Sequence, residues 1–285
     1  MAYLTIITPT YNAGKYIADC IESVQSQTSR NFDHFIMDGN SIDNTISLVN
    51  TYLDKAAHLK LFTGKDGGVF DAMNKGIQSS NSEWLYFLGA DDRLYDEKVL
   101  ENITEYLTTC KADIIYGDVY FEQMQRVYDG PFDMEKILKR NLCHQSAFYH
   151  RSVFEKVGYY NQKYRGNADY DHNLRCWLGG KIRHQYIQRT VAFYADGGLS
   201  SAQPDLLFKE DFPSITTDAV LNGDWAWRLK VIYLSKIYRK LFQRYSFRTG
   251  MSQIIARRFL IYRFPALILM TLSIPFYLIN SNNSR

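Results

Sequence analysis

The 285-residue chain has only four cysteines, and no acidic residue follows Asp224. The cysteines stand at positions 20, 110, 143 and 176, so no two have the two-residue gap of metal and redox motifs. We therefore expect reduced, packed cysteines, as in cytosolic proteins, rather than a disulfide framework. Residues 1–10 lack the basic start of a signal peptide and read as a buried strand, which predicts that this part is not exported by that route.

The lack of acidic residues near the C-terminal end gives a strong charge asymmetry. Residues 1–224 hold 22 basic and 30 acidic residues, a net charge of −8, whereas residues 225–285 hold 11 basic residues and a net charge of +11. Such asymmetry indicates an anionic partner, either nucleic acid or a membrane surface. From Trp225 onward, basic residues alternate with large apolar ones, as in a basic amphipathic helix on anionic lipid.

An apolar run at 264–279 decides between these partners. It is shorter than the roughly 20 residues of a spanning helix, and Pro265 and Pro275 interrupt it. We expect residues 221–285 to form a helical, membrane-associating region that inserts without crossing. A true span that includes residues 261–262, and a basic helix face packed against the rest of the chain, are alternatives. Nucleic acid is disfavoured, because a solvated binding stripe needs no such apolar run.

The remaining residues alternate short β-branched or aromatic runs with segments of helical periodicity. This pattern predicts an α/β fold with a Rossmann-like, doubly wound, mainly parallel sheet in a domain of residues 1–220, divided into halves at about residue 118. Ligands of such sheets bind beyond the carboxyl ends of the strands. The expected strands are 4–8, 35–38, 59–62, 84–88 and 114–116.

Polar or acidic motifs follow four of these strands. A single Asp in such a place reads as a helix N-cap or a turn former. Four clusters together instead fill the binding edge of the sheet with carboxylates. The motifs are TPTYN at 8–12, DGNSIDNT at 38–45, GKDGGVFDAMNKG at 64–76 and GADD at 89–92.

This set of motifs resembles the inverting glycosyltransferases of family 2, which have the GT-A fold. The resemblance covers roughly residues 3–180, is most specific in DGGVFDAMNKG, and is closest to the bacterial O-antigen and surface-polysaccharide subgroup. It implies a UDP-sugar donor, with transfer of a hexosyl or N-acetylhexosaminyl group. A carboxylate beside a backbone turn suits the uracil imide and ribose hydroxyls. The nucleotide-sugar-binding residues that it implies are Thr8, Pro9, Tyr11, Asp38, Asp66, Gly67, Gly68, Asn74, Lys75 and Asp91.

Three carboxylates of the motifs, and one lysine, need a separate interpretation. Asp43 is expected to cap the helix that begins near Thr45 rather than to bind the donor. Lys75 is either a point charge beside the diphosphate or an exposed helix lysine. Asp92 matches the acidic metal motif and is expected to bind Mg or Mn, while Asp91 binds ribose or a metal-bound water; the alternative is a turn before the next helix.

The stretch NADYDHNLR at 167–175 supplies the expected general base. Asp169 matches the position that takes the acceptor's proton, although Ala168 replaces the Glu of many members. Asp171 is the second candidate, or else an ion-pair partner of Arg175 at helical spacing. A base and a metal-held leaving group favour single displacement with inversion.

The acceptor side is expected to include His144 and Gln145 of the CHQSAF segment. His144 is an acceptor contact, a metal ligand or a structural hydrogen-bonding residue. The resemblance also implies a polyprenyl-diphosphate-linked saccharide acceptor at the cytoplasmic face of a bacterial inner membrane. A nucleotidyltransferase is disfavoured because TPTYNAGKY replaces its glycine- and arginine-rich loop. A non-catalytic, membrane-bound nucleotide-sugar-binding scaffold is the alternative from another class.

Overall fold

The computed structural model describes residues 2–195, 204–226, 229–230, 232–234 and 236–237. These residues fall into two compact units: the first holds residues up to 177 together with 181–209, and the second holds 178–180 with the described residues from 210 onward. All of the candidate site residues belong to the first unit. The predicted domain boundary near residue 220 stays a prediction.

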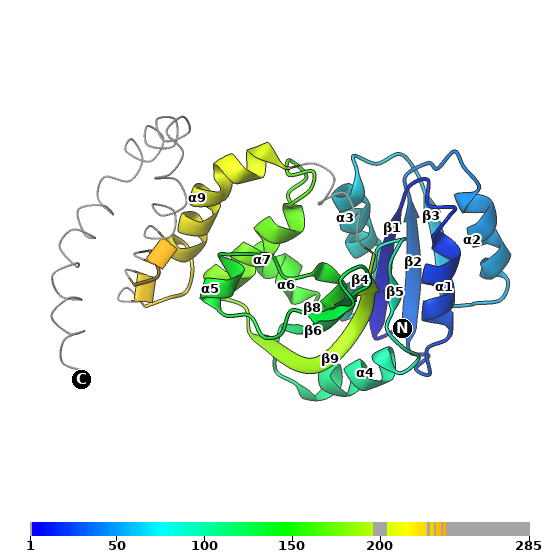
Figure 1. The fold of residues 1–285 in the computed structure, drawn as a ribbon, viewed down its shortest axis with the longest axis horizontal. Coiled ribbons are helices and arrows are strands. Elements are labelled where there is room, and N and C mark those ends of the chain that lie inside the picture. Colours follow the sequence, from blue (N-terminus) through cyan, green and yellow to red (C-terminus); the bar gives the residue numbers. More distant parts are fainter. Residues whose placement is uncertain (1, 196–203, 227–228, 231, 235, 238–285) are drawn as a thin grey trace, which may run out of the picture. The chain divides into compact units, whose positions relative to one another are not determined.

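The first part of the sheet is parallel, with neighbouring strands in the order β3-β2-β1-β4. The strands are β1 (Leu4–Thr10), β2 (Phe32–Asp38), β3 (Leu59–Thr63) and β4 (Trp84–Phe87), and the crossover helices are α1 (Ile17–Gln25), α2 (Thr45–Leu53) and α3 (Val69–Ser79). Helices α1 and α2 lie on one side of these strands and α3 lies on the other (Figure 1). The predicted α/β class is confirmed, and each expected strand lies within or overlaps an observed one.

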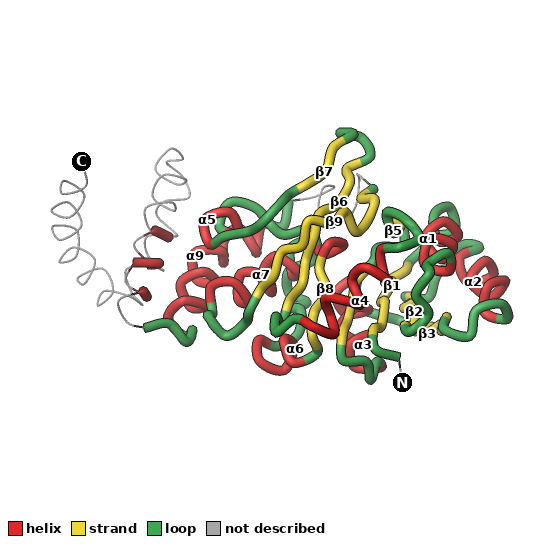
Figure 2. Tube along the Cα trace, turned by 90° about the horizontal axis from the view of Figure 1, so that it is seen from below, coloured by secondary structure: helices red, strands yellow, loops and turns green. Residues whose placement is uncertain are grey.

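The second part of the sheet is mixed. Strand β8 (Ala147–His150) is antiparallel to both β4 and β6 (Ile114–Phe121), whereas β9 (His184–Tyr194) is parallel to β6 and antiparallel to β5 (Arg93–Leu94). Figure 2 shows β9 running beside β6. A tight turn at Glu122–Gln125 returns the chain as β7 (Arg126–Tyr128), and such a short link permits only an antiparallel partner. The predicted parallel arrangement therefore holds for the first four strands and for the pair β6 and β9, whereas the other pairs of the second part are antiparallel.

Helices lie between the strands of this second part, and the last of them follows β9. They are α4 (Val99–Thr109), α5 (Met134–Ile137), the 3-10 turn η1 (His144–Ser146), α6 (Ser152–Val157), α7 (Ala168–Leu178) and α9 (Leu206–Leu221). Helix α7 begins at the expected NADYDHNLR stretch.

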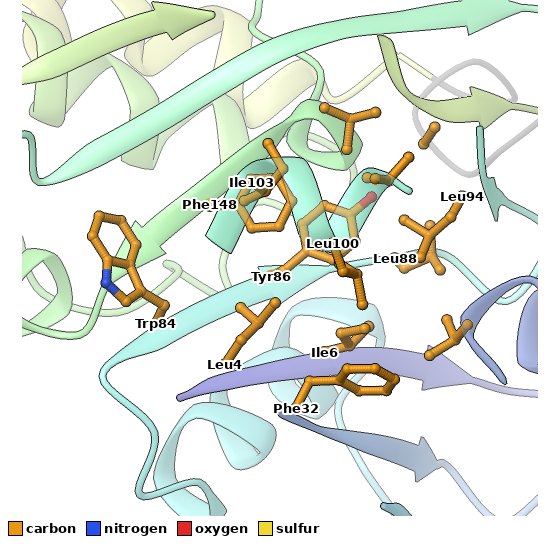
Figure 3. Close-up of a cluster of buried hydrophobic side chains, with 14 of the residues drawn as sticks. Leu4, Ile6, Phe32, Trp84, Tyr86, Leu88, Leu94, Leu100, Ile103 and Phe148 are labelled. Carbon is orange, nitrogen blue, oxygen red and sulfur yellow. The ribbon is translucent and has the colours of Figure 1, made fainter. Parts of the chain in front are cut away.

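The main core lies between the sheet and the helices α1 and α4. Figure 3 shows Leu4 and Ile6 of β1 beside Tyr86 of β4, whose ring stacks on Phe148 with centroids 4.4 Å apart. On the opposite face α3 packs closely on β1, because a Cβ on Gly76 would lie 2.5 Å from Ile7 Cγ2. This close packing fixes the DAMNKG segment against the central strand, at the end where the polar motifs gather.

In the second unit, Trp225 packs over Gly180 and donates an indole hydrogen bond to the Leu178 carbonyl at 2.6 Å. Among helices formed by the described residues, none combines the length and apolar character that crossing a membrane requires. The apolar run at 264–279 and most of the basic stretch after Trp225 lie outside the described residues.

Candidate active site

Two of the predicted donor-binding carboxylates meet beyond β2 and β3. Asp38 ends β2 and is 2% exposed; its carboxylate accepts hydrogen bonds from the amide and the hydroxyl of Ser41, at 2.9 and 2.5 Å. Asp66 lies against Gly39, where a Cβ would be only 2.6 Å from Asp66 Oδ2. The glycine thus allows the Asp66 carboxylate to approach the main chain beside Asp38.

The residues at the end of β1 divide into buried and exposed ones. Thr8 and Pro9 are buried within β1, and the Thr8 hydroxyl lies 2.9 Å from His34 Nε2. Burial, and then His58, lower the pKa of His34 to about 3, so this imidazole is neutral. Tyr11 is 62% exposed and stands free at the rim of the sheet. Of the three predicted residues, Tyr11 is therefore the one whose side chain is open to a ligand.

The DGG turn at the start of α3 is closed by two carboxylates. Asp66 Oδ1 accepts from the Gly68 amide and Asp71 Oδ2 accepts from the Gly67 amide, both at 2.9 Å. Gly68 has φ +120°, a backbone conformation that residues other than glycine rarely adopt. Lys75 pairs with Asp71 at 2.9 Å, on the helix surface.

Asn74 is placed differently from its prediction as a donor-binding residue. Its side chain is buried; the amide donates to the Tyr160 carbonyl at 2.9 Å, and its oxygen accepts from the Tyr160 amide at 3.1 Å. Nearby, Gln162 donates to Asp71 at 2.9 Å. The α3 motif therefore anchors the loop that leads into α7. Asp43, expected as a helix cap, accepts from the Thr45 amide at 3.0 Å at the start of α2.

The acidic pair after β4 contains one exposed and one buried carboxylate. Asp91 is exposed, whereas Asp92 is 3% exposed and accepts from Gln145 Nε2 at 2.8 Å and from the Ala195 amide at 3.0 Å. Burial, and then the charge of Asp91, raise the pKa of Asp92 to about 6. A Cβ on Gly89 would lie 2.5 Å from Asp92 Oδ2 and 2.9 Å from Asp91 Oδ1, so the turn brings both carboxylates to one point.

This pair fits a hard divalent cation that also binds phosphate. The described residues contain no group of three or more His, Cys, Asp or Glu side chains arranged for a metal. Mg²⁺ commonly uses one or two carboxylates and completes its shell with waters and substrate phosphates. Burial is the main cause of the raised pKa of Asp92, and the charge of Asp91 adds to it; a bound cation would offset this repulsion between the two carboxylates.

The candidate base stands at the first turn of α7. Asp169 Oδ2 accepts from Asn141 Nδ2 at 2.8 Å and lies 3.3 Å from His144 Nδ1, while Oδ1 accepts from the Tyr170 amide at 2.8 Å. Asp171 is 3% exposed and pairs with Arg175 at 2.9 Å. The geometry thus matches the ion-pair alternative for Asp171 and leaves Asp169 as the carboxylate beside the acceptor-side residues.

Adjacent residues of η1 contact the two key carboxylates. His144 approaches Asp169, and Gln145 donates to Asp92. The hydroxyl of Tyr86, a buried residue of β4, donates to the Gln145 carbonyl at 2.8 Å and fixes the turn on the sheet. The acidic pair and the candidate base are therefore held around one short turn.

Sequence reasoning missed four residues of this site. Gly39 and Gly89 stand inside recognised motifs, and their signal is a glycine within two residues of a carboxylate. Asp71 lies in the DAMNKG segment but was not singled out. Asn141 carries no signal that sequence alone provides, because only the fold brings it to Asp169.

Comparisons with known proteins relate this chain to one family. Residues 5–158 match the family model described as Glycosyl transferase family 2. The chain is 36% identical over 216 residues to a PGL/p-HBAD biosynthesis glycosyltransferase of Mycobacterium bovis, which covers 74% of this chain and 84% of the relative.

Two solved structures are similar in fold. S. aureus TarS 1-349 in complex with UDP-GlcNAc has a TM-score of 0.71 and 19% identity, covering 89% of this chain and 76% of that one. The mannosyltransferase PcManGT from Pyrobaculum calidifontis, in complex with GDP-Man and Mn2+, has a TM-score of 0.62 and 17% identity, covering 97% and 80%. These likenesses, with the family match, confirm the predicted GT-A fold.

Proposed function

This chain belongs to glycosyl transferase family 2, and on that premise we propose that it transfers a hexosyl or N-acetylhexosaminyl group from a UDP-sugar to an acceptor hydroxyl, with inversion. The observation that carries the proposal is the placement of Asp92 and Asp169 around η1. Gln145 holds the first carboxylate and His144 approaches the second. A donor whose diphosphate lies at Asp92 would then present its sugar toward Asp169.

The chemistry that we assign to Asp169 is proton removal. The acceptor oxygen attacks the anomeric carbon and forms the new C–O bond, while the bond from that carbon to the diphosphate oxygen breaks. The acceptor's proton passes to the Asp169 carboxylate, and the nucleoside diphosphate leaves. Attack opposite the leaving group inverts the configuration, so an α-linked donor gives a β-linked product.

The donor's nucleoside is assigned to the edge formed by β1, β2 and β3. Asp38 and Asp66 are acceptors for imide and ribose hydroxyl protons, and exposed Tyr11 offers a flat ring at the same rim. UDP is favoured because TarS, a neighbour in fold, was solved with UDP-GlcNAc. Gly67 and Gly68 leave space for the diphosphate near the main chain.

Asp92, with Asp91 beside it, would hold a divalent cation, Mg or Mn, in the proposed donor site. When bound, the cation neutralises charge on the departing diphosphate. PcManGT was solved with Mn2+, which supports this assignment by likeness of fold. Asp92 would supply the direct ligand, and Gln145 and the Ala195 amide fix its orientation.

The acceptor and its location are further parts of the proposal. We assign a polyprenyl-diphosphate-linked saccharide, used in bacterial surface polysaccharide synthesis at the cytoplasmic face of the inner membrane. Its support is the charge of +11 carried by residues 225–285, which suits an anionic lipid surface. Flotation with anionic vesicles tests this: the full chain should float, and a chain lacking residues 225–285 should not. Equal flotation of both chains would contradict the proposal that residues 225–285 bind the membrane.

Calorimetric titration with UDP-GlcNAc and UDP-glucose, with and without Mn²⁺, tests the donor site. We expect Mn²⁺-dependent binding that Asp92→Asn weakens at least tenfold, because a metal ligand and its charge are lost. Asp54→Asn, an exposed carboxylate at the end of α2, is the matched control and should bind as the wild type does. Binding of GDP-mannose but not of UDP-sugars would show that the donor nucleotide is GDP and not UDP. Donor binding without any sugar transfer would favour the non-catalytic scaffold.

A further inference from the structure

We propose that Asn141 is a positioning residue that orients the Asp169 carboxylate, and that Asn173 and Tyr149 in turn hold Asn141. The inference rests on the proposed role of Asp169 as the general base. Asn173 belongs to the NADYDHNLR stretch, whereas Asn141 and Tyr149 lie outside the quoted motifs, and none of the three was assigned a role there. Their arrangement extends the site from α7 into the sheet.

The three side chains form a continuous chain of hydrogen bonds that ends at the base. Asn141 Nδ2 donates to Asp169 Oδ2 at 2.8 Å, and Asn173 Nδ2 donates to Asn141 Oδ1 at 2.9 Å. The Tyr149 hydroxyl donates to Asn173 Oδ1 at 3.2 Å. Asn173 and Tyr149 are 0% exposed, so this part of the chain is shielded from water.

The direction of donation follows from the carboxylate at the end of the chain. An ionised Asp169 only accepts, so the amide nitrogen of Asn141 must face it. The Asn141 oxygen then faces the Asn173 amide nitrogen, and the Asn173 oxygen accepts from Tyr149. Burial raises the pKa of Tyr149, which keeps its hydroxyl protonated as a donor. Every member therefore has one consistent orientation, which is the condition for a buried polar network to be rigid.

The chain also links the base to a fixed element of the fold. Tyr149 lies in β8, in the middle of the sheet. Asn173 stands four residues after Asp169 on α7, so the side chains of Asp169 and Asn173 share one face of that helix. Burial, and then Arg175, lower the pKa of the adjacent His172, so no imidazolium charge competes for Asp169 there. Asn141 is the one member that contacts the base directly.

Loss of this support should lower turnover more than binding. In Asn141→Ala, Asp169 Oδ2 keeps only the more distant His144, so the carboxylate can rotate away from the acceptor hydroxyl. Small misplacements of a reacting group cost up to about a hundredfold in rate. We expect kcat to fall about tenfold or more, with the KM for the donor unchanged, because the donor residues lie on other elements.

The experiment compares sugar transfer by the wild type, Asn141→Ala, Tyr149→Phe and Asn102→Ala. Asn102 is an exposed asparagine of α4 and should leave kcat and KM unchanged. Tyr149→Phe removes only one hydroxyl, keeps the ring, and should lower kcat severalfold. In the double variant with Asn141→Ala it should add almost nothing, because its effect passes through Asn141. Thermal unfolding identifies variants that have lost the fold.

The outcomes separate this inference from the proposed function. A wild type that transfers sugar, with lower kcat in both variants and unchanged donor KM, supports the inference. If Asn141→Ala and Tyr149→Phe transfer at the wild-type kcat, or lose donor affinity instead, the positioning role is wrong while the transferase stands. If Asn141→Ala fails to fold, the kcat of Tyr149→Phe alone decides. Absence of transfer by the wild type overturns the proposed function and the inference together.

Discussion

Gly89→Ala perturbs the acidic pair through a single added methyl group. A Cβ at this position would stand 2.5 Å from Asp92 Oδ2 and 2.9 Å from Asp91 Oδ1. To restore a separation of 3.0 Å, Asp92 Oδ2 must retreat by about 0.5 Å. Asp92 is held by Gln145 and by the Ala195 amide, so it moves only at the expense of those hydrogen bonds.

The expected magnitude follows from this overlap. Overpacking of a fixed site costs about 1–3 kcal/mol. If most of the cost falls on the ligand-ready arrangement, donor binding weakens by about 5- to 150-fold. Calorimetry with UDP-sugar and Mn²⁺ measures the effect, and thermal unfolding measures what falls on the fold. Gly64→Ala, where a Cβ meets nothing within 4 Å, controls for the general effect of glycine replacement on unfolding. Wild-type donor affinity in Gly89→Ala would refute the claim that this turn aligns the carboxylates for a cation.

Two further predictions concern hydrogen bonds that stabilise the fold. Burial acts to raise the pKa of Asp113, but hydrogen bonds from Arg183 and Lys156 outweigh it and lower the pKa to about 2 from 3.8. This stabilisation is present above pH 3.8 and is lost as the pH falls through about 2. In urea unfolding, Asp113→Asn should lower the free energy of unfolding by about 1–2 kcal/mol at pH 7, a value kept small because both basic partners are partly exposed to solvent. The difference between wild type and variant should shrink below pH 3.8. A difference that does not depend on pH would contradict this prediction. Asn74→Leu should lower the free energy of unfolding by about 2 kcal/mol, because it leaves the main-chain amide and carbonyl of Tyr160 unpaired. The KM for the donor should stay unchanged. A raised donor KM with unchanged stability would instead favour a direct contact between Asn74 and the donor.

The parallel half of the fold was predictable because each strand has a compact apolar run and a turn-forming end. Strands β1 to β4 follow this rule, and their ends gave the motifs of the donor edge. The mixed part of the sheet was not predictable, because the direction of β8 depends on its pairing with both β4 and β6. Those contacts join residues far apart in the chain, and no local pattern specifies them.

The same distinction applies to the site. Asp38, Asp66, Asp91 and Asp92 were predicted as site residues because they stand at or shortly after the ends of strands. Asn74 was predicted to bind the donor because it belongs to a conspicuous motif, whereas in the structure its amide binds the main chain of Tyr160. Sequence spacing reports which residues stand on α3, but not which of them faces the ligand edge and which faces a neighbouring loop.

The supporting residues of Asp169 show the limit most clearly. Asn141 lies 28 positions before the base, and Tyr149 and Asn173 come from a strand and a helix. Each is an ordinary polar or aromatic residue in its local context. Only the packing of α7 against β8 joins them into one chain, so tertiary structure was needed to find it.

The most direct test of the account is an NMR assay of sugar transfer from an α-linked UDP-sugar, with the wild type and Asp169→Asn. The spectrum reports both the amount of product and the configuration at its anomeric carbon. We expect a β-linked product from the wild type and almost none from Asp169→Asn, with donor binding retained in the variant. An α-linked product, or transfer by Asp169→Asn at the wild-type rate, would contradict single displacement with Asp169 as the base.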